Sequence, residues 1–173
     1  MDEDAVISRA VEMIRRGTLD QKHEAVRELA RLGAAAVDPV ITVLVEEEDN
    51  DLRWYLSQVL ATIGGPAIEP MILSLQMVPD DDARRYLAAA LGTIGKPAVD
   101  PLIGLLTHDR EDVRGFAALA LCRIGQPAVE PLLEMMDTTD GIPHTCAALT
   151  LWKMGELGPE ALSDYFKRKK EEE

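Results

Sequence analysis

Cysteine, aromatic and histidine residues are scarce in this sequence. Its 173 residues include 2 Cys, 2 Trp, 3 Tyr, 2 Phe and 3 His. Cys122 and Cys146 are too few for a disulfide framework and form no Cys-x-x-Cys pair, so we interpret them as small buried hydrophobic residues. Three histidines do not provide a histidine-rich metal site. The composition therefore predicts neither a metal nor another cofactor.

Long apolar runs and an excess of positive charge are also missing. No apolar run approaches the roughly 20 residues that a membrane helix needs, and Met1–Asp4 lack the basic start of a signal peptide. Lys and Arg number 18 against 31 Asp and Glu, a net charge of −13. Because phosphate binding depends on clustered cations, this balance argues against nucleic acid as a partner. We expect a soluble, cytoplasmic protein that does not bind membranes.

Catalytic motifs are absent as well. The glycines of Ile63-Gly64-Gly65-Pro66 are not followed by the Gly-Lys-Ser/Thr ending of a phosphate-binding loop. Cys146 and His144 are two residues apart, so on one helix they face different directions and do not form a nucleophile–base pair. We therefore predict no catalytic residue.

The strongest positive signal is a repeat of 30 to 31 residues. Glycines recur at Gly33, Gly64, Gly95, Gly125 and Gly155, and prolines recur with the same spacing at Pro39, Pro70, Pro101 and Pro131. Glycine is favoured just past the end of a helix and proline in the first turn of one, so each block predicts a helix end followed by a helix start. Acidic stretches such as Glu46–Asp51 suit the first turn of the second helix of each unit.

This punctuation predicts an all-α fold of five helix pairs. The predicted pairs are 3–16 with 20–31, 35–45 with 50–62, 66–76 with 80–93, 97–107 with 110–123, and 127–137 with 140–153, and a closing helix covers 159–170. Strand signals are absent, because the β-branched residues follow helical spacing. We expect one repeat domain over 1–173, with units of about 1–31, 32–62, 63–93, 94–123 and 124–153 and the closing segment 154–173.

One unit carries a family resemblance. The stretch from Asp112-Val113-Arg114 through Ala117-Ala118 and Ala120-Leu121 to Ile124-Gly125-Gln126-Pro127-Ala128-Val129-Glu130-Pro131-Leu132 resembles the short HEAT-like repeat named after phycobilisome lyases. The resemblance covers nearly the whole chain and implies a right-handed α-α superhelix, a HEAT-like α-solenoid, whose second helices line a concave surface. Members of this family range from adaptor proteins to bilin lyases and deoxyhypusine hydroxylase. The motif is specific for the fold and says little about function.

The hydroxylase branch of that family holds two irons through several His-Glu pairs, as the resemblance implies. His23-Glu24 stands at the corresponding position here, but the next units have Trp54-Tyr55 and Arg85-Tyr86 instead. A site needing three or more ligands cannot be built from one pair. A role like that of bilin lyases, or of another enzyme subunit, stays open as an alternative.

The second helices carry a column of cations one repeat apart, Lys22, Arg53, Arg84 and Arg114, with His144 at the last position. Aspartates stand two residues earlier, at Asp20, Asp51, Asp82 and Asp112. We interpret the column as a structural charge ladder, in which each cation pairs with an aspartate of its own or an adjacent repeat.

Five further columns of the second helices point away from the predicted core. They contain five of the seven aromatic residues and, together with the cation column, nine cations against one acid, Glu24. Arg, Trp and Tyr dominate binding hot spots, so we expect a non-enzymatic scaffold that binds an acidic segment of a partner protein in the groove. The predicted contact residues are Trp54, Tyr55, Arg85, Tyr86, Phe116 and Arg123. Packing between repeats is the alternative for the Tyr55, Tyr86 and Phe116 stripe, and nucleic-acid binding is a weaker alternative for the groove.

Overall fold

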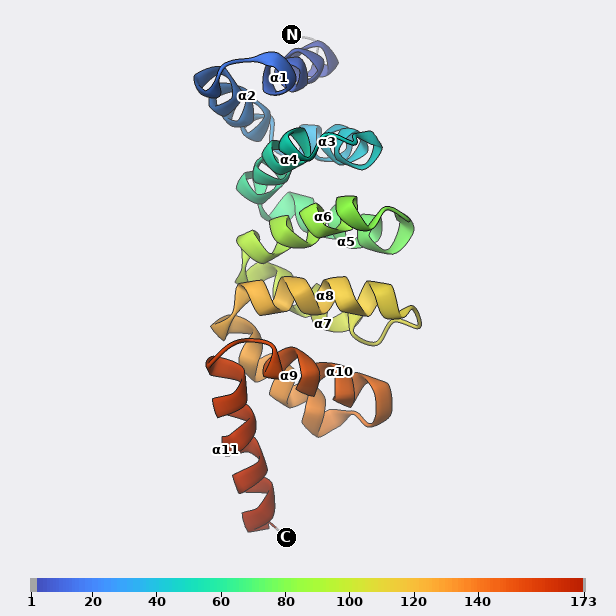
Figure 1. Cartoon of the computed structure of the whole chain (residues 1–173), viewed down its shortest axis with the longest axis vertical. Helices are drawn as coiled ribbons and strands as arrows, with labels where there is room; N and C mark the ends of the chain where they lie inside the picture. Colours follow the sequence, from blue (N-terminus) through green and yellow to red (C-terminus); the bar gives the residue numbers. More distant parts are fainter. Residues whose placement is uncertain (1–2, 173) are drawn as a thin grey trace. The chain divides into compact units, whose positions relative to one another are not determined.

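The computed structural model describes residues 3–172, and within these residues it is helical without a strand (Figure 1). The predicted all-α class is confirmed. The helices are α1 (Glu3–Arg16), α2 (Leu19–Arg31), α3 (Ala34–Glu46), α4 (Asn50–Ile63), α5 (Gly65–Met77), α6 (Asp81–Ile94), η1 (Lys96–Ala98), α7 (Val99–Leu105), α8 (Glu111–Ile124), α9 (Gln126–Thr138), α10 (Gly141–Trp152) and α11 (Leu157–Glu172). None of the helices described is both long and apolar enough to cross a membrane.

The predicted helix bounds agree with the structure to within a few residues, with one departure. The helix expected over 97–107 is divided into the 3-10 turn η1 and the short helix α7. Tight turns end α7, because the Leu106 amide donates to the Ile103 carbonyl and the Thr107 amide to the Gly104 carbonyl. Gly104, a poor helix former, lies in this last turn.

The acidic stretches between paired helices act as helix caps. A carboxylate oxygen of Asp49 accepts the backbone amide of Asp51 at 2.8 Å and that of Leu52 at 3.4 Å. Before α6, Asp80 accepts the amide of Asp82 at 3.0 Å. These bonds satisfy amides that the first turn of a helix leaves without an intrahelical partner.

The repeated glycines join one helix pair to the next. Gly64 donates its amide to Leu60 at the end of α4 and accepts the amide of Ala67 at the start of α5. Its backbone has φ 75° and ψ −127°, a conformation essentially restricted to glycine. Gly33, Gly95 and Gly125 also have a positive φ, which explains why glycine recurs at this position of each repeat.

We expect Gly64→Ala to lower the free energy of unfolding by about 2 kcal/mol, because this backbone conformation is strained for alanine. An added Cβ would meet no atom within 4 Å, so the effect isolates backbone strain from crowding. Gly65→Ala is the matched control, since Gly65 has no positive φ and equal space around it. Urea unfolding followed by circular dichroism measures both, and equal losses would contradict the argument.

The chain divides into two compact units, Met1–Ile94 and Gly95–Glu173; Met1, Asp2 and Glu173 lie outside the described residues. In the first unit, α1 contacts α3 and α3 contacts α5, while α2 contacts α4 and α4 contacts α6. First helices therefore form one layer and second helices the other. The core between them is aliphatic, with Leu29, Leu56 and Leu87 fully buried.

The second unit repeats the two-layer plan and ends in the predicted closing helix. α7 contacts α9, α8 contacts α10, and α11 packs against both α9 and α10. Tyr165 of α11 is 5% exposed, and Lys169 lies 2.9 Å from a carboxylate oxygen of Asp137 on α9. The hydrogen bond from Lys169 lowers the pKa of Asp137. That the whole chain forms a single domain stays a prediction.

Candidate functional site

Arg53 and Arg114 of the cation column bind the chain that precedes their own helices. Arg53 is 4% exposed; its Nε donates to the carbonyl oxygen of Leu44 at the end of α3 at 3.1 Å, and its guanidinium pairs with Asp80. In the second unit Arg114 donates to the carbonyl oxygens of His108 at 2.7 Å and Asp109 at 2.8 Å. These bonds satisfy carbonyl groups where the preceding helix or turn ends.

His144 occupies the last position of the column in the same way. Its Nδ1 lies 3.0 Å from the carbonyl oxygen of Met136 on α9. A carbonyl oxygen only accepts, so this bond requires the proton on Nδ1. The cation column is therefore structural, as the sequence predicted, and its members are committed to the fold.

Three of the four cations of the column pair with an aspartate of their own or an adjacent repeat, as expected, although Asp80 and Asp81 stand outside the aspartate column named in the sequence. Lys22 pairs with Asp51 of the next repeat. Arg53 pairs with Asp80, Arg84 contacts Asp81 at 3.2 Å, and Arg114 uses backbone carbonyls. Helical periodicity places the cations correctly but does not show which loop acid comes within reach of each one.

A pH effect follows from the Arg53–Asp80 contact. Burial acts to raise the pKa of Asp80, but the amide of Asp82 and the Arg53 guanidinium outweigh it and hold that pKa below its ordinary value. The ionised Asp80 therefore adds to the free energy of unfolding above the unfolded carboxyl pKa of about 4. This stabilisation is lost as the pH falls through the lower folded pKa. We expect Asp80→Asn to destabilise by less than about 1 kcal/mol at pH 7, since the Asp80 side chain is 42% exposed.

The measurement is urea unfolding at pH 7 and pH 2. As the pH falls the difference between the variant and the original chain should shrink, because protonation removes the Asp80 charge from the folded original chain. A difference that persists unchanged at pH 2 would contradict the assignment of the effect to the Asp80 charge.

Three of the five outward columns of the second helices carry no carboxylate, and the one acid of the other two columns, Glu24, pairs with Arg27 and Arg31. Three positions recur one, five and nine residues after the cation column, and all are exposed or half-buried. They are His23, Arg27, Arg31, Trp54, Gln58, Thr62, Arg85, Ala89, Thr93, Gly115, Leu119, Arg123, Thr145, Leu149 and Lys153. Five of these are cations and none is Asp or Glu, in a chain with 31 acidic residues. The first helices α3, α5, α7 and α9 contain no Lys or Arg at all.

Most of the predicted contact residues retain accessible surface. In the first unit Trp54 is 48% exposed, Arg85 is exposed and 2.6 Å from Asp82, and Tyr86 is half-buried. In the second unit Phe116 is half-buried and Arg123 is exposed. These residues come from α4, α6 and α8, within two separate units.

Tyr55 departs from the other predicted contacts. It is 6% exposed, and its ring lies 4.8 Å from the Trp54 ring in an edge-to-face arrangement and 6.1 Å from the His23 ring. Lys22 Nζ stands 5.0 Å from the ring centroid. The packing alternative describes Tyr55, because its ring stabilises the contact of α4 with α2 and offers little surface to a partner.

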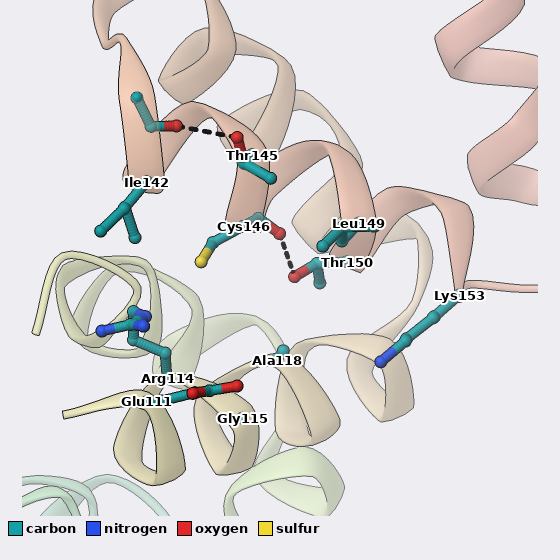
Figure 2. Close-up of a pocket in the computed structure, with 11 residues that line it drawn as sticks. Glu111, Arg114, Gly115, Ala118, Ile142, Thr145, Cys146, Leu149, Thr150 and Lys153 are labelled. Atoms are coloured by element: carbon teal, nitrogen blue, oxygen red, sulfur yellow. Dashed lines mark hydrogen bonds between the residues drawn. The ribbon is translucent and has the colours of Figure 1, made fainter.

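A groove of about 480 Å³ opens between α8 and α10 in the second unit (Figure 2). Gly115 and Ala118 of α8 lie across from Ile142, Cys146 and Leu149 of α10. Ile142 is 60% and Leu149 53% exposed, which is high for large aliphatic side chains. Lys153 stands at one end, and Glu111 and Arg114 stand at the other.

Residues 68–152 match the family described as HEAT repeats. These residues are similar to HEAT repeats. They run from α5 to the end of α10 and include the residues that line the α8/α10 groove except Lys153, and the match spans just under half of the chain. No curated protein matches the chain.

Solved structures similar to these HEAT-like repeats are distant. A designed armadillo repeat protein in complex with the peptide (KR)4 is 14% identical, with 92% of this chain and 87% of that chain covered and a TM-score of 0.35. An engineered protein is 20% identical, with 93% and 86% covered and a TM-score of 0.36. A designed armadillo repeat protein for modular peptide recognition is 15% identical, with 93% and 87% covered and a TM-score of 0.35.

The groove residues of the HEAT-like repeats were missed by sequence reasoning. Leu149 lies in an outward column but was not predicted as a contact, and Cys146 was interpreted as a small buried hydrophobic residue. The signal that was available is Gly115, where the equivalent positions of earlier repeats hold Trp54 and Arg85. A missing side chain in a repeated column indicates a gap beside the next helix.

Metal-ligating groups do not gather in the described part of the chain. Among residues 3–172 no three His, Cys, Asp or Glu side chains are arranged so that they could hold a metal ion. Burial raises the pKa of Cys122, whose Sγ contacts the carbonyl oxygen of Thr150 at 3.5 Å. A raised thiol pKa disfavours the reactive thiolate.

Proposed function

We propose that the protein is a non-enzymatic scaffold that binds an acidic segment of a partner protein on the outward faces of its second helices. The observation that carries the proposal is the separation of charge: cations and large apolar side chains occupy these faces, whereas the first helices α3, α5, α7 and α9 carry acids without cations. A net charge of −13 repels an acidic partner at a distance. The cations of α1 and α11 stand among carboxylates of the same helices, so the outward columns, where acids are rare, are the surface that attracts such a partner.

The side chains on these faces suit protein recognition. Trp54 presents a large rigid ring, and Arg85 presents a planar donor group. The Arg85–Asp82 ion pair is exposed, and exposed pairs contribute between about 0 and 1 kcal/mol, so a partner carboxylate competes for Arg85 at little cost. Tyr86, Phe116 and Arg123 are the further proposed contacts, and Tyr55 supports Trp54 by packing against its ring.

The positions of the candidate nucleophile and base support a non-enzymatic role. Cys146 lines the groove, whereas the ring of His144 is engaged with the Met136 carbonyl. The two side chains therefore point to different surroundings, as their spacing on one helix predicts. The 30- to 31-residue spacing further supports repeats of the phycobilisome-lyase type, and a cytoplasmic location is also part of this proposal.

The test is a quantitative pull-down with three baits: the original chain, Arg85→Glu combined with Tyr86→Ala, and Lys96→Glu. Lys96 is an exposed cation in η1, outside the outward columns, so its reversal is the control for general charge effects. We expect an acidic protein on the first and third baits and at least a tenfold loss on the second. Circular dichroism should show equal helicity in all three.

Two results would contradict the proposal. One is an eluate that the double variant does not change. The other is retention of nucleic acid that falls steeply with added salt, which would favour the phosphate-binding alternative.

A further inference from the structure

The groove between α8 and α10 combines an apolar strip with a cationic end. The strip is formed by Ile142, Cys146 and Leu149, spaced four and three residues apart on one face of α10, and by Ala118 across from them (Figure 2). Lys153 stands where α10 ends. Arg123 is exposed in the last turn of α8, the helix beside α10.

The groove exists because α8 has no side chain at position 115. A Cβ atom built on Gly115 would meet nothing within 4 Å, so the space above this residue is open. Glycine in a helix interior costs stability relative to alanine, so this gap is not a requirement of the helix itself. The groove can therefore be closed by substitution without crowding the core.

The polar groups that line the groove are already used within α10. Thr145 donates its hydroxyl to the carbonyl of Gly141 at 2.9 Å, and Thr150 donates to the carbonyl of Cys146 at 2.7 Å. An extended peptide would find few donors for its own backbone carbonyls here. A helical segment satisfies its own backbone and needs only apolar contacts at i, i+3, i+4 and i+7.

The charged residues beside the groove determine which polar residues the bound segment should carry. Lys153 and Arg123 form no ion pair with any residue from 3 to 172, and both are exposed. At the opposite end Arg114 is bound to the carbonyls of His108 and Asp109 and stands with Glu111. Carboxylates of an occupant are therefore favoured at the Lys153 end.

We propose that this groove binds an amphipathic helix of a partner protein, with aliphatic side chains on the Ile142–Leu149 strip and carboxylates beside Lys153 and Arg123. The residues that line the groove on α10 run from Gly141 to Lys153, about 18 Å at 1.5 Å per residue, so the groove matches a helix of three to four turns. The inference rests on the proposed scaffold function and adds the place and the chemistry of the bound segment.

A library of displayed 14-residue helical peptides with randomised faces is the probe. It is selected on the whole chain, and the recovered peptides are measured against Gly115→Phe, which fills the groove, and Gly115→Ala, which leaves most of it open. We expect recovered peptides to carry aliphatic residues at i, i+3 or i+4, and i+7 with neighbouring acids. Their affinity should fall at least tenfold on Gly115→Phe and change less than twofold on Gly115→Ala.

A second pair of variants tests the charge. Arg123→Glu with Lys153→Glu should weaken the same peptides at least tenfold, whereas Lys96→Glu in the same unit should leave them unchanged. Peptides that bind equally to Gly115→Phe, or that carry basic residues, would overturn the inference. If those peptides are lost on Arg85→Glu with Tyr86→Ala instead, the scaffold function stands and the groove is the wrong place. If no peptide is recovered, the groove proposal fails, and the pull-down decides the scaffold function separately.

Discussion

Gly158→Ala is expected to release α11 from α9 and α10. A Cβ atom at Gly158 would overlap the carbonyl oxygen of Leu151 in the last turn of α10, a backbone atom that has no rotamer with which to move aside. The helix must therefore shift as a body, which disturbs the burial of Leu162 and Tyr165 and the Lys169–Asp137 contact. The cost cannot exceed that of undocking α11, which we place at about 4 kcal/mol from these two buried side chains.

Amide hydrogen exchange measures this release directly. Protection should fall along Leu157–Glu172 and persist in α8, because undocking is a local opening of one helix. Gly115→Ala is the control, since its added methyl group meets no neighbour and should stabilise α8 by up to about 1 kcal/mol. Protection of α11 that is the same in both variants would show that α11 does not need the close approach at Gly158.

The helices were predictable from the sequence because their limits depend on local chemistry. Glycine with positive φ, proline in a first turn and aspartate caps each act within four residues, and the repeat shows every signal several times. Gly104 is the instructive miss: helical periodicity continued to 107, but a glycine in the last turn allowed 3-10 bonds to end α7 at Leu105. The low helix propensity of Gly104 outweighed the helical periodicity in that turn.

The candidate site was less predictable because it depends on neighbours in space. The outward columns follow from helical spacing, and Trp54 and Arg85 are exposed as that spacing predicts. Tyr55 lies next to Trp54 on α4, but His23 and Lys22 of α2 cover its ring. A projection of α4 alone does not contain these neighbours. The α8/α10 groove requires both the missing side chain at Gly115 and the position of α10 beside it.

Arg53→Ala is expected to lower the free energy of unfolding by about 3 kcal/mol. The substitution removes a side chain that is 5% exposed and leaves a cavity between α3, α4 and the loop that contains Asp80. It also deprives the Leu44 carbonyl of its donor. Asp80 is not stranded, because its side chain is 42% exposed and water replaces the guanidinium. The loss therefore comes from packing and the unsatisfied carbonyl more than from the ion pair.

Two companion variants separate these contributions in urea unfolding at pH 7. Arg85→Ala removes an arginine one repeat further on whose side chain is 65% exposed and paired with Asp82, so we expect a change within about 0.5 kcal/mol. Arg53→Lys keeps the charge but replaces the planar fork that serves Leu44 and Asp80 together, so its loss should fall between the two. If Arg53→Ala and Arg85→Ala cost the same, the cation column is a set of surface charges, and the carbonyl bond to the preceding helix contributes nothing to holding the repeats together.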